Sequence, residues 1–167
     1  MASVAAAGGK AWHERLLPDR ALAWAALALL ACVLAALFRG RAQFATVPTV
    51  VWPHLLTIVL ALALTPVMLL RRKGDTRHRV LGYIWVAAMF GTAALSFRIR
   101  TANGGFSFIH ILSIWTVIQV PLIVWRARQH NIVGHRRSVR GMVVGALLIA
   151  GFFTFPFDRL LGHWLFG

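Results

Sequence analysis

The stretch "TVVWPHLLTIVLALALTPVMLL", residues 49 to 70, decides the fold, because it is apolar over its whole length and carries no charged residue. A hydrocarbon core of about 30 Å requires about 20 residues at a helical rise of about 1.5 Å per residue. Backbone groups inside a bilayer find no water to bond, so a crossing segment of this length must be a helix. Residues 49 to 70 therefore predict a transmembrane helix.

The rest of the chain has the same character. Of its 167 residues, 59% are hydrophobic and 13% are charged, whereas charged residues make up about 25% of a soluble domain. Further apolar stretches predict transmembrane helices at 21–38, 80–97, 106–125 and 139–157. The expected fold is an all-α integral membrane bundle of five transmembrane helices.

The formal net charge is +14, and most of the basic residues that produce it lie between the apolar stretches. Thirteen of the 18 lysines and arginines fall in residues 1–20 and in the segments after the second and fourth predicted helices. Under the positive-inside rule, residues 1–20 form a cytoplasmic segment, and residues 158–167 form an external tail. We expect a bacterial inner-membrane protein whose basic residues meet anionic lipid headgroups rather than nucleic acid.

Two parts of the chain resemble each other. "HLLTI" at 54–58 matches "HILSI" at 110–114, Pro66 matches Pro121, and "HR" at 78–79 matches "HR" at 135–136. These landmarks keep their order and nearly their spacing, which indicates a duplicated helical hairpin at 49–100 and 104–157. Two hairpins of the same orientation are related by a pseudo-twofold axis along the membrane normal. The helix at 21–38 stands outside the repeat.

The duplication places four histidines in two layers. His54 and His110 form an outer pair, and His78 and His135 form an inner pair. All four acidic residues lie outside the apolar stretches, which removes carboxylate-based metal and proton chemistry. Two neutral imidazoles and no carboxylate suit bis-histidine ligation of haem b, the iron of an electron carrier.

This interpretation gives roles to further groups. Arg79 and Arg136 lie beside the inner pair, where they could bind haem propionates or lipid phosphate. A quinone or a redox protein would be the electron partner of such a haem. The outer pair lies within apolar sequence and is expected to be the stronger site.

Other interpretations remain open. The histidines could bond only hydroxyls or carbonyls of neighbouring helices, in a structural or accessory subunit without a cofactor. A small transporter or lipid-headgroup binder could use the basic cytoplasmic rim. No hydrolytic or nucleotide-binding motif is present, and the sequence leaves the oligomeric state open.

Three segments carry a family resemblance: "KGDTRHRVLGY" at 73–83, "GGFSFIHILS" at 104–113 and "HNIVGHRRSVRGM" at 130–142. They resemble conserved blocks of predicted bacterial multi-pass membrane proteins named only as a domain of unknown function, and this resemblance implies no activity. The histidine layout is also similar to that of the ascorbate-reducible transmembrane cytochromes b. That resemblance implies haem ligands from two alternating helix pairs, in proteins that typically have six spans.

Overall fold

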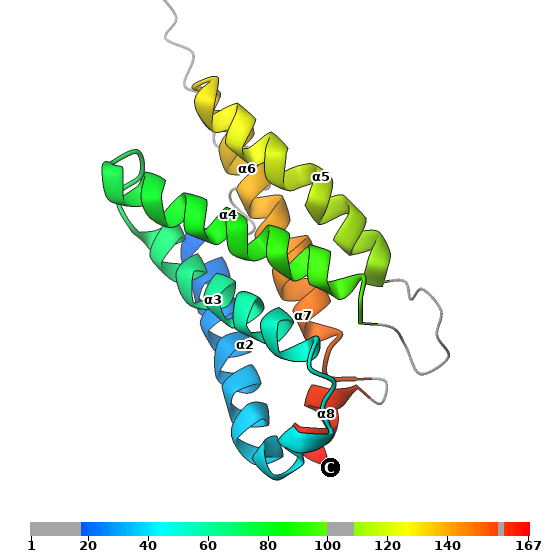
Figure 1. Ribbon diagram of the computed structural model, residues 1–167. Coiled ribbons are helices and arrows are strands. Elements are labelled where there is room, and N and C mark those ends of the chain that lie inside the picture. Colours follow the sequence, from blue (N-terminus) through cyan, green and yellow to red (C-terminus); the bar gives the residue numbers. More distant parts are fainter. Residues whose placement is uncertain (1–17, 100–108, 157–158) are drawn as a thin grey trace, which may run out of the picture.

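The computed structural model describes residues 18–99, 109–156 and 159–167, and within these ranges every regular element is a helix. The elements in chain order are α2 (Asp19–Arg39), the 3-10 helix η1 (Gly40–Thr46), α3 (Val51–Leu70), α4 (Thr76–Ser96), α5 (Ile109–Arg128), α6 (Ile132–Met142), the π-helical segment η2 (Val143–Ile149), α7 (Ala150–Phe152) and α8 (Leu160–Phe166) (Figure 1). The all-α class expected from the sequence is confirmed.

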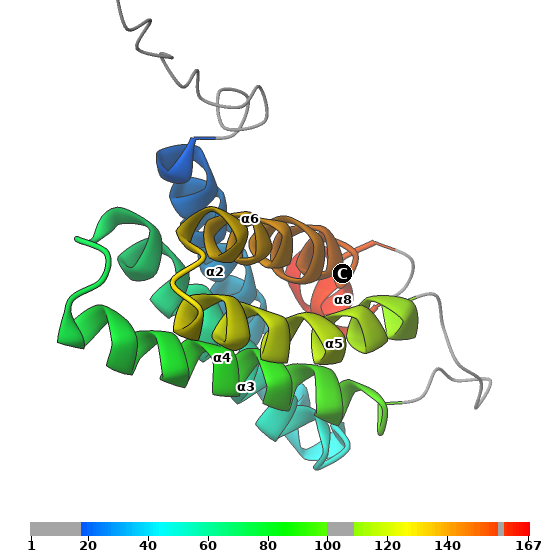
Figure 2. The same cartoon turned by 90° about the horizontal axis from the view of Figure 1, so that it is seen from above.

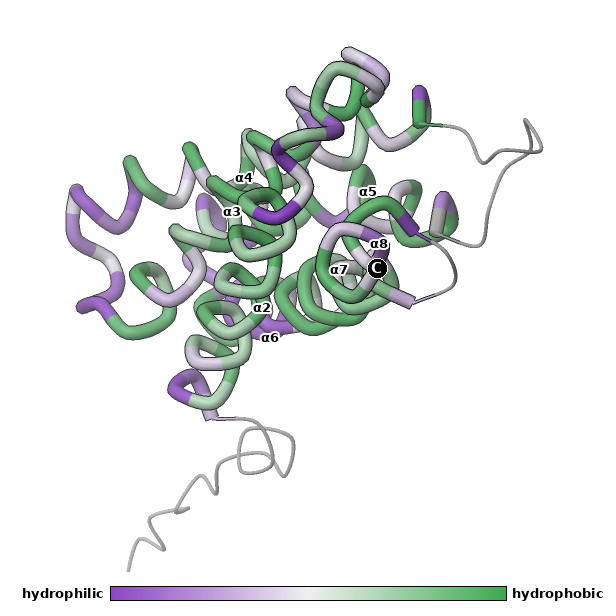
Figure 3. Tube along the Cα trace, turned by 90° about the horizontal axis from the view of Figure 1, so that it is seen from below, coloured by the Kyte–Doolittle hydropathy of each residue, from purple (hydrophilic) through white to green (hydrophobic). Residues whose placement is uncertain are grey.

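Membrane-spanning length and apolar composition occur together in four helical segments of the described chain: Asp19–Thr46, Val51–Leu70, Thr76–Ser96 and His110–Arg128. Hydrophobic residues run along these helices, and hydrophilic residues gather mainly at turns and helix ends (Figure 3). Many large apolar side chains point outward, among them Trp24, Leu56 and Ile118. The chain is therefore a multi-pass membrane protein.

Each long helix packs against its neighbours in the chain. α2 packs on α3, α3 on α4, α4 on α5 and α5 on α6, while η2 packs back on α2 and closes the bundle (Figures 1 and 2). The core holds Leu62, Met89, Met142 and Leu147, each almost fully buried. α4 thus packs against both α3 and α5, an order that determines how the histidines meet.

The last long helix begins earlier than the sequence indicated. We expected it to start at residue 139, but α6 begins at Ile132 because the Asn131 side chain caps it, accepting a 2.9 Å hydrogen bond from the Gly134 N–H. Helical backbone continues through η2 and α7 to Phe152. The preceding helix, expected at 106–125, continues to Arg128 in the structure, and residues 106–108 lie outside the described residues.

The segment 158–167, expected to be a tail, contains α8, which packs on α2 and η1. There the Trp164 indole N–H donates a 3.0 Å hydrogen bond to Gln43 Oε1, and Arg39 Nη1 donates a 2.6 Å bond to the Leu165 carbonyl. The Trp164 ring lies directly over Gly40. The segment 1–20 lies outside the described residues except for its last three.

Two residues determine the shape of the short turn between α3 and α4. Gly74 has a φ of +93°, which an L side chain rarely adopts. Asp75 follows and caps α4, because its Oδ1 accepts a 2.6 Å hydrogen bond from the His78 backbone N–H. This cap fixes His78 in the first turn of α4.

Candidate functional site

The outer histidines lie on α3 and α5. His54 Nδ1 is 3.0 Å from the Thr92 carbonyl oxygen of α4, a contact in which an Nδ1–H donates. His110 is 4% exposed, and its ring centroid lies 6.0 Å from that of Phe97. Each outer histidine therefore has α4, or the residue just after it, as a neighbour.

Hydroxyl groups join the same three helices close to these histidines. Thr92 Oγ1 donates a 2.8 Å hydrogen bond to Thr57 Oγ1, which ties α4 to α3. Ser96 Oγ donates a 2.6 Å bond to Ser113 Oγ, which ties α4 to α5. These contacts lie within one turn of His54 and of His110.

Helices that touch this closely have axes about 8–10 Å apart, whereas a haem between two helices holds them wider. α4 also packs against both α3 and α5. α4 therefore lies against both helices that carry the outer pair, and haem ligation by this pair stays a prediction.

The inner histidines, His78 and His135, lie near enough for their charges to interact. His135 Nδ1 is 3.1 Å from the Ile123 carbonyl oxygen of α5, a contact in which an Nδ1–H donates. His78 Nδ1 is buried without a hydrogen-bond partner in the described chain. Bis-histidine ligation at the inner pair stays a prediction.

The two arginines expected beside the inner pair have different surroundings. Arg79 is exposed on α4. Arg136 Nη2 lies 4.0 Å from Asp19 Oδ2, so a carboxylate of this chain takes the position expected for a haem propionate or a lipid phosphate.

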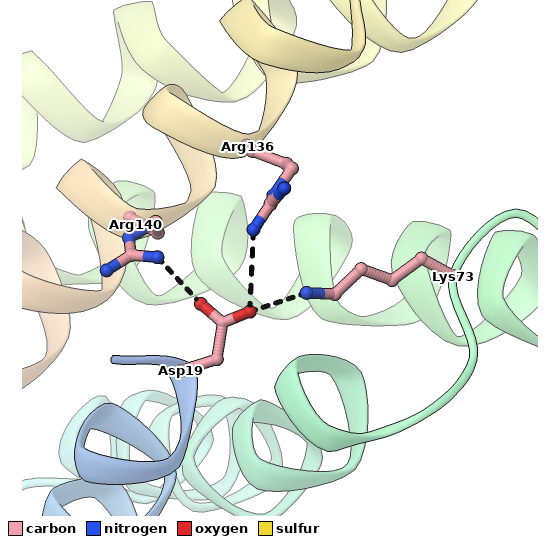
Figure 4. A network of polar contacts seen from close by, with 4 residues as sticks. All are labelled: Asp19, Lys73, Arg136 and Arg140. Atoms are coloured by element: carbon pink, nitrogen blue, oxygen red, sulfur yellow. Dashed lines mark hydrogen bonds and ion pairs between the residues drawn. The ribbon is translucent and has the colours of Figure 1, made fainter. Parts of the chain in front are cut away.

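Asp19, in the first turn of α2, is the centre of a cluster of cations (Figure 4). Lys73 Nζ lies 2.5 Å from Asp19 Oδ2, and Arg140 Nη1 lies 2.9 Å from Oδ1. Arg136 reaches the same carboxylate at 4.0 Å. We call these four residues the Asp19 cluster. It holds the start of α2, the α3–α4 turn and α6 at one end of the bundle.

A cavity of about 490 Å³ lies between α5 and α6. Its lining comes from α5, the following turn and α6: Trp115, Gln119, Arg126, Asn131, Val133, Gly134, Arg137, Ser138 and Gly141. We call this cavity the α5–α6 groove. None of these lining residues is acidic, and two are arginines.

The two arginines that line the groove differ in their partners. Arg126 Nη1 donates a hydrogen bond to Ser138 Oγ, which ties α5 to α6. Arg137 is exposed, and no carboxylate of the described residues forms an ion pair with it. The groove can therefore accept an anion.

The sequence contained a signal for this site that our interpretation missed. Gly134, Arg137, Ser138 and Gly141 follow the spacing i, i+3, i+4 and i+7, which is one face of a helix. We gave a ligand role to Arg136 but read Arg137 and Arg140 only as topology signals, and we expected the helix to begin at residue 139. With α6 starting at Ile132, the four residues line the groove together.

Within the described residues, no group of three or more His, Cys, Asp or Glu side chains could hold a metal ion. Comparison with known proteins gave no family model, no curated protein and no solved structure that matches the chain. The resemblances noted from the sequence therefore stay predictions, and the function must be argued from the geometry.

Proposed function

We propose that this protein is an inner-membrane protein that binds a phosphate-bearing anion in the α5–α6 groove, at the cytoplasmic side. The observation that carries the proposal is the set of polar and cationic groups converging there: Arg126, Arg137, Asn131 and Ser138, with no acidic lining residue. Arginine binds phosphate oxygens through two parallel N–H donors, and such charge-assisted bonds are about twice as strong as neutral ones. This develops the lipid-headgroup interpretation of the sequence.

The orientation rests on the charge distribution. The Asp19 cluster joins residues of the three segments that the positive-inside rule assigns to the cytoplasm. We further propose that Ile132–Phe152 crosses the membrane as a fifth span, since 21 helical residues extend about 31 Å. The C-terminus is then external.

Topology reporters test this orientation. A reporter that is active only outside the cell should be inactive when fused after Lys73 and active when fused after Gly167. A cytoplasm-specific reporter at the same two positions is the control and should give the opposite pattern. Activity outside after Lys73 would place the groove at the external face.

Removing the open cation of the groove tests anion binding. Arg137→Gln should lower the affinity of the protein for phosphatidylglycerol, compared with its affinity for phosphatidylcholine, by about tenfold. The reason is that one charge-assisted contact contributes about 1.5–3 kcal/mol. The measurement is lipid retention by the detergent-purified protein in native mass spectrometry.

Arg79→Gln is the matched control, since it removes the same charge from an exposed position outside the groove. Equal retention in wild type, Arg137→Gln and Arg79→Gln would contradict the proposal. It would favour the interpretation in which polar residues only organise helix packing.

Haem b at the inner pair is a second candidate, supported by the buried Nδ1 of His78, which has no hydrogen-bond partner in the described chain. Bound between two imidazoles, haem supplies one-electron transfer. The Ile123 carbonyl would orient His135 for that role, as carbonyls orient metal-bound histidines in general.

An absorption spectrum of the purified protein, oxidised and then reduced with dithionite, tests this candidate. If haem is bound at the inner pair, the reduced bands should disappear in His135→Ala and persist in His54→Ala. Colourless protein from haem-replete cells would eliminate the candidate and leave the groove proposal untouched.

A further inference from the structure

The chemistry of the α5–α6 groove changes along its length. Its loop end carries Arg126, Asn131 and Arg137. Gln119 lies about 10 Å further along α5 from Arg126, and Trp115 lies about 6 Å beyond Gln119, at about 1.5 Å per residue. The order is therefore cationic, then amide, then aromatic, running from the helix end toward the middle of the bundle.

Glycine leaves space open in the part of the groove beside Gly141. A Cβ atom placed on Gly141 would meet no other atom within 4 Å, so free space lies over this residue. One turn further on, a Cβ on Gly145 would lie 3.3 Å from the Trp115 ring. The groove is thus open over Gly141 and closed at its inner end by Trp115 against Gly145.

The groove lies beside the lipid-facing surface. Ile114 and Ile118, the chain neighbours of Trp115 and Gln119, are 53% and 57% exposed. Val133, which lines the groove, is 79% exposed. In a membrane protein such apolar exposed side chains face lipid, so an acyl chain can reach the groove sideways from the bilayer.

From this order we infer that the groove holds one membrane phospholipid and not a free phosphate. The phosphate lies at Arg126 and Arg137, the ester region lies beside Gln119, whose amide NH₂ can donate to an ester carbonyl, and one acyl chain lies over Gly141 against Trp115. The inference rests on the proposed function, since it names the ligand class of the same groove.

The test is a substitution that fills the part of the groove assigned to the acyl chain and leaves Arg126 and Arg137 unchanged. Gly141→Leu projects a side chain into space that is empty of atoms within 4 Å of the Cβ, and leucine favours a helix more than glycine does. The variant should keep or raise the thermal stability of the protein. We expect it to lose the phosphatidylglycerol that wild type retains through detergent exchange, measured by native mass spectrometry.

Gly82→Leu on α4, outside the groove, is the matched control and should retain the lipid. Glycerol 3-phosphate, which has the headgroup chemistry but no chain, should not displace the retained lipid. Lysophosphatidylglycerol, with one chain, should displace it.

The possible failures are distinct. If Gly141→Leu retains as much lipid as wild type, or glycerol 3-phosphate displaces the lipid as well as lysophosphatidylglycerol does, the inference is wrong and the anion site stands. If Arg137→Gln also retains wild-type levels of phosphatidylglycerol, the proposed function itself is wrong.

Discussion

Gly40→Ala is expected to destabilise the protein by about 2–3 kcal/mol, because an added methyl group would overlap the Trp164 ring. The Cβ would lie 2.1 Å from Trp164 Cδ2, closer than any real Cβ contact. The ring cannot easily move away, since Trp164 is 4% exposed and its N–H is bonded to Gln43. Phe44 also packs on the ring, with centroids 5.7 Å apart. Thermal unfolding in detergent measures the loss.

Gly141→Ala is the matched control for this substitution. It also adds one methyl group to a helical glycine, but it meets no atom within 4 Å. Its stability should be unchanged or higher by up to about 1 kcal/mol, the difference in helix propensity between glycine and alanine. Adding Trp164→Leu to Gly40→Ala should cost less than the two single changes combined. Simple additivity would show that the ring and the methyl group do not collide.

Asp19→Asn is expected to cost about 2 kcal/mol, since it leaves partly buried cations without their carboxylate. The Arg140 side chain is 13% exposed and that of Asp19 is 20% exposed, so solvent screens this pair less than a surface pair. Hydrogen bonds to charged groups contribute about 1.5–3 kcal/mol each, and part of that is retained by the amide oxygen. The loss should appear as a lower unfolding temperature and should shrink at high salt.

Asp75→Asn controls for the removal of a carboxylate near the same end of the bundle. Asp75 caps α4, and asparagine caps helices about as well as aspartate. Its ion pair with Arg71 is long, at 3.9 Å, and more than a third exposed. A stability change close to zero is expected. If Asp75→Asn costs as much as Asp19→Asn, the Asp19 cluster has no special role.

The all-α membrane fold could be predicted from the sequence because a bilayer leaves an apolar stretch such as 49–70 no alternative to a helix. Helix boundaries were predicted less well where charged residues and a helix cap indicate different starting points for a helix. Arg136, Arg137 and Arg140 lower the hydropathy of the last helix, yet the Asn131 cap starts it at Ile132. The fifth span and the hairpin duplication stay predictions.

The candidate site was predicted only in part. The sequence indicated that His78 and His135 belong together, and this pairing stays a prediction. It could not indicate that His54 contacts the Thr92 carbonyl, because that depends on how α3 and α4 are rotated against each other. The α5–α6 groove depends in the same way on the rotation of α6 against α5, where Gly145 meets Trp115.

Contacts at both ends of α2 have a consequence for how the protein is made. Asp19 is bound by Arg140, which is 121 residues later in the chain, and Arg39 is bound by the Leu165 carbonyl, 126 residues later. At about 5–20 residues per second, a ribosome adds that much chain in roughly 6–25 s. α2 is therefore in the membrane for this time before its most distant partners in the described chain have been synthesised. Lys73, 54 residues after Asp19, can bind the carboxylate earlier, whereas the bonds from Arg140 and to Leu165 form only after most of the described chain has been made.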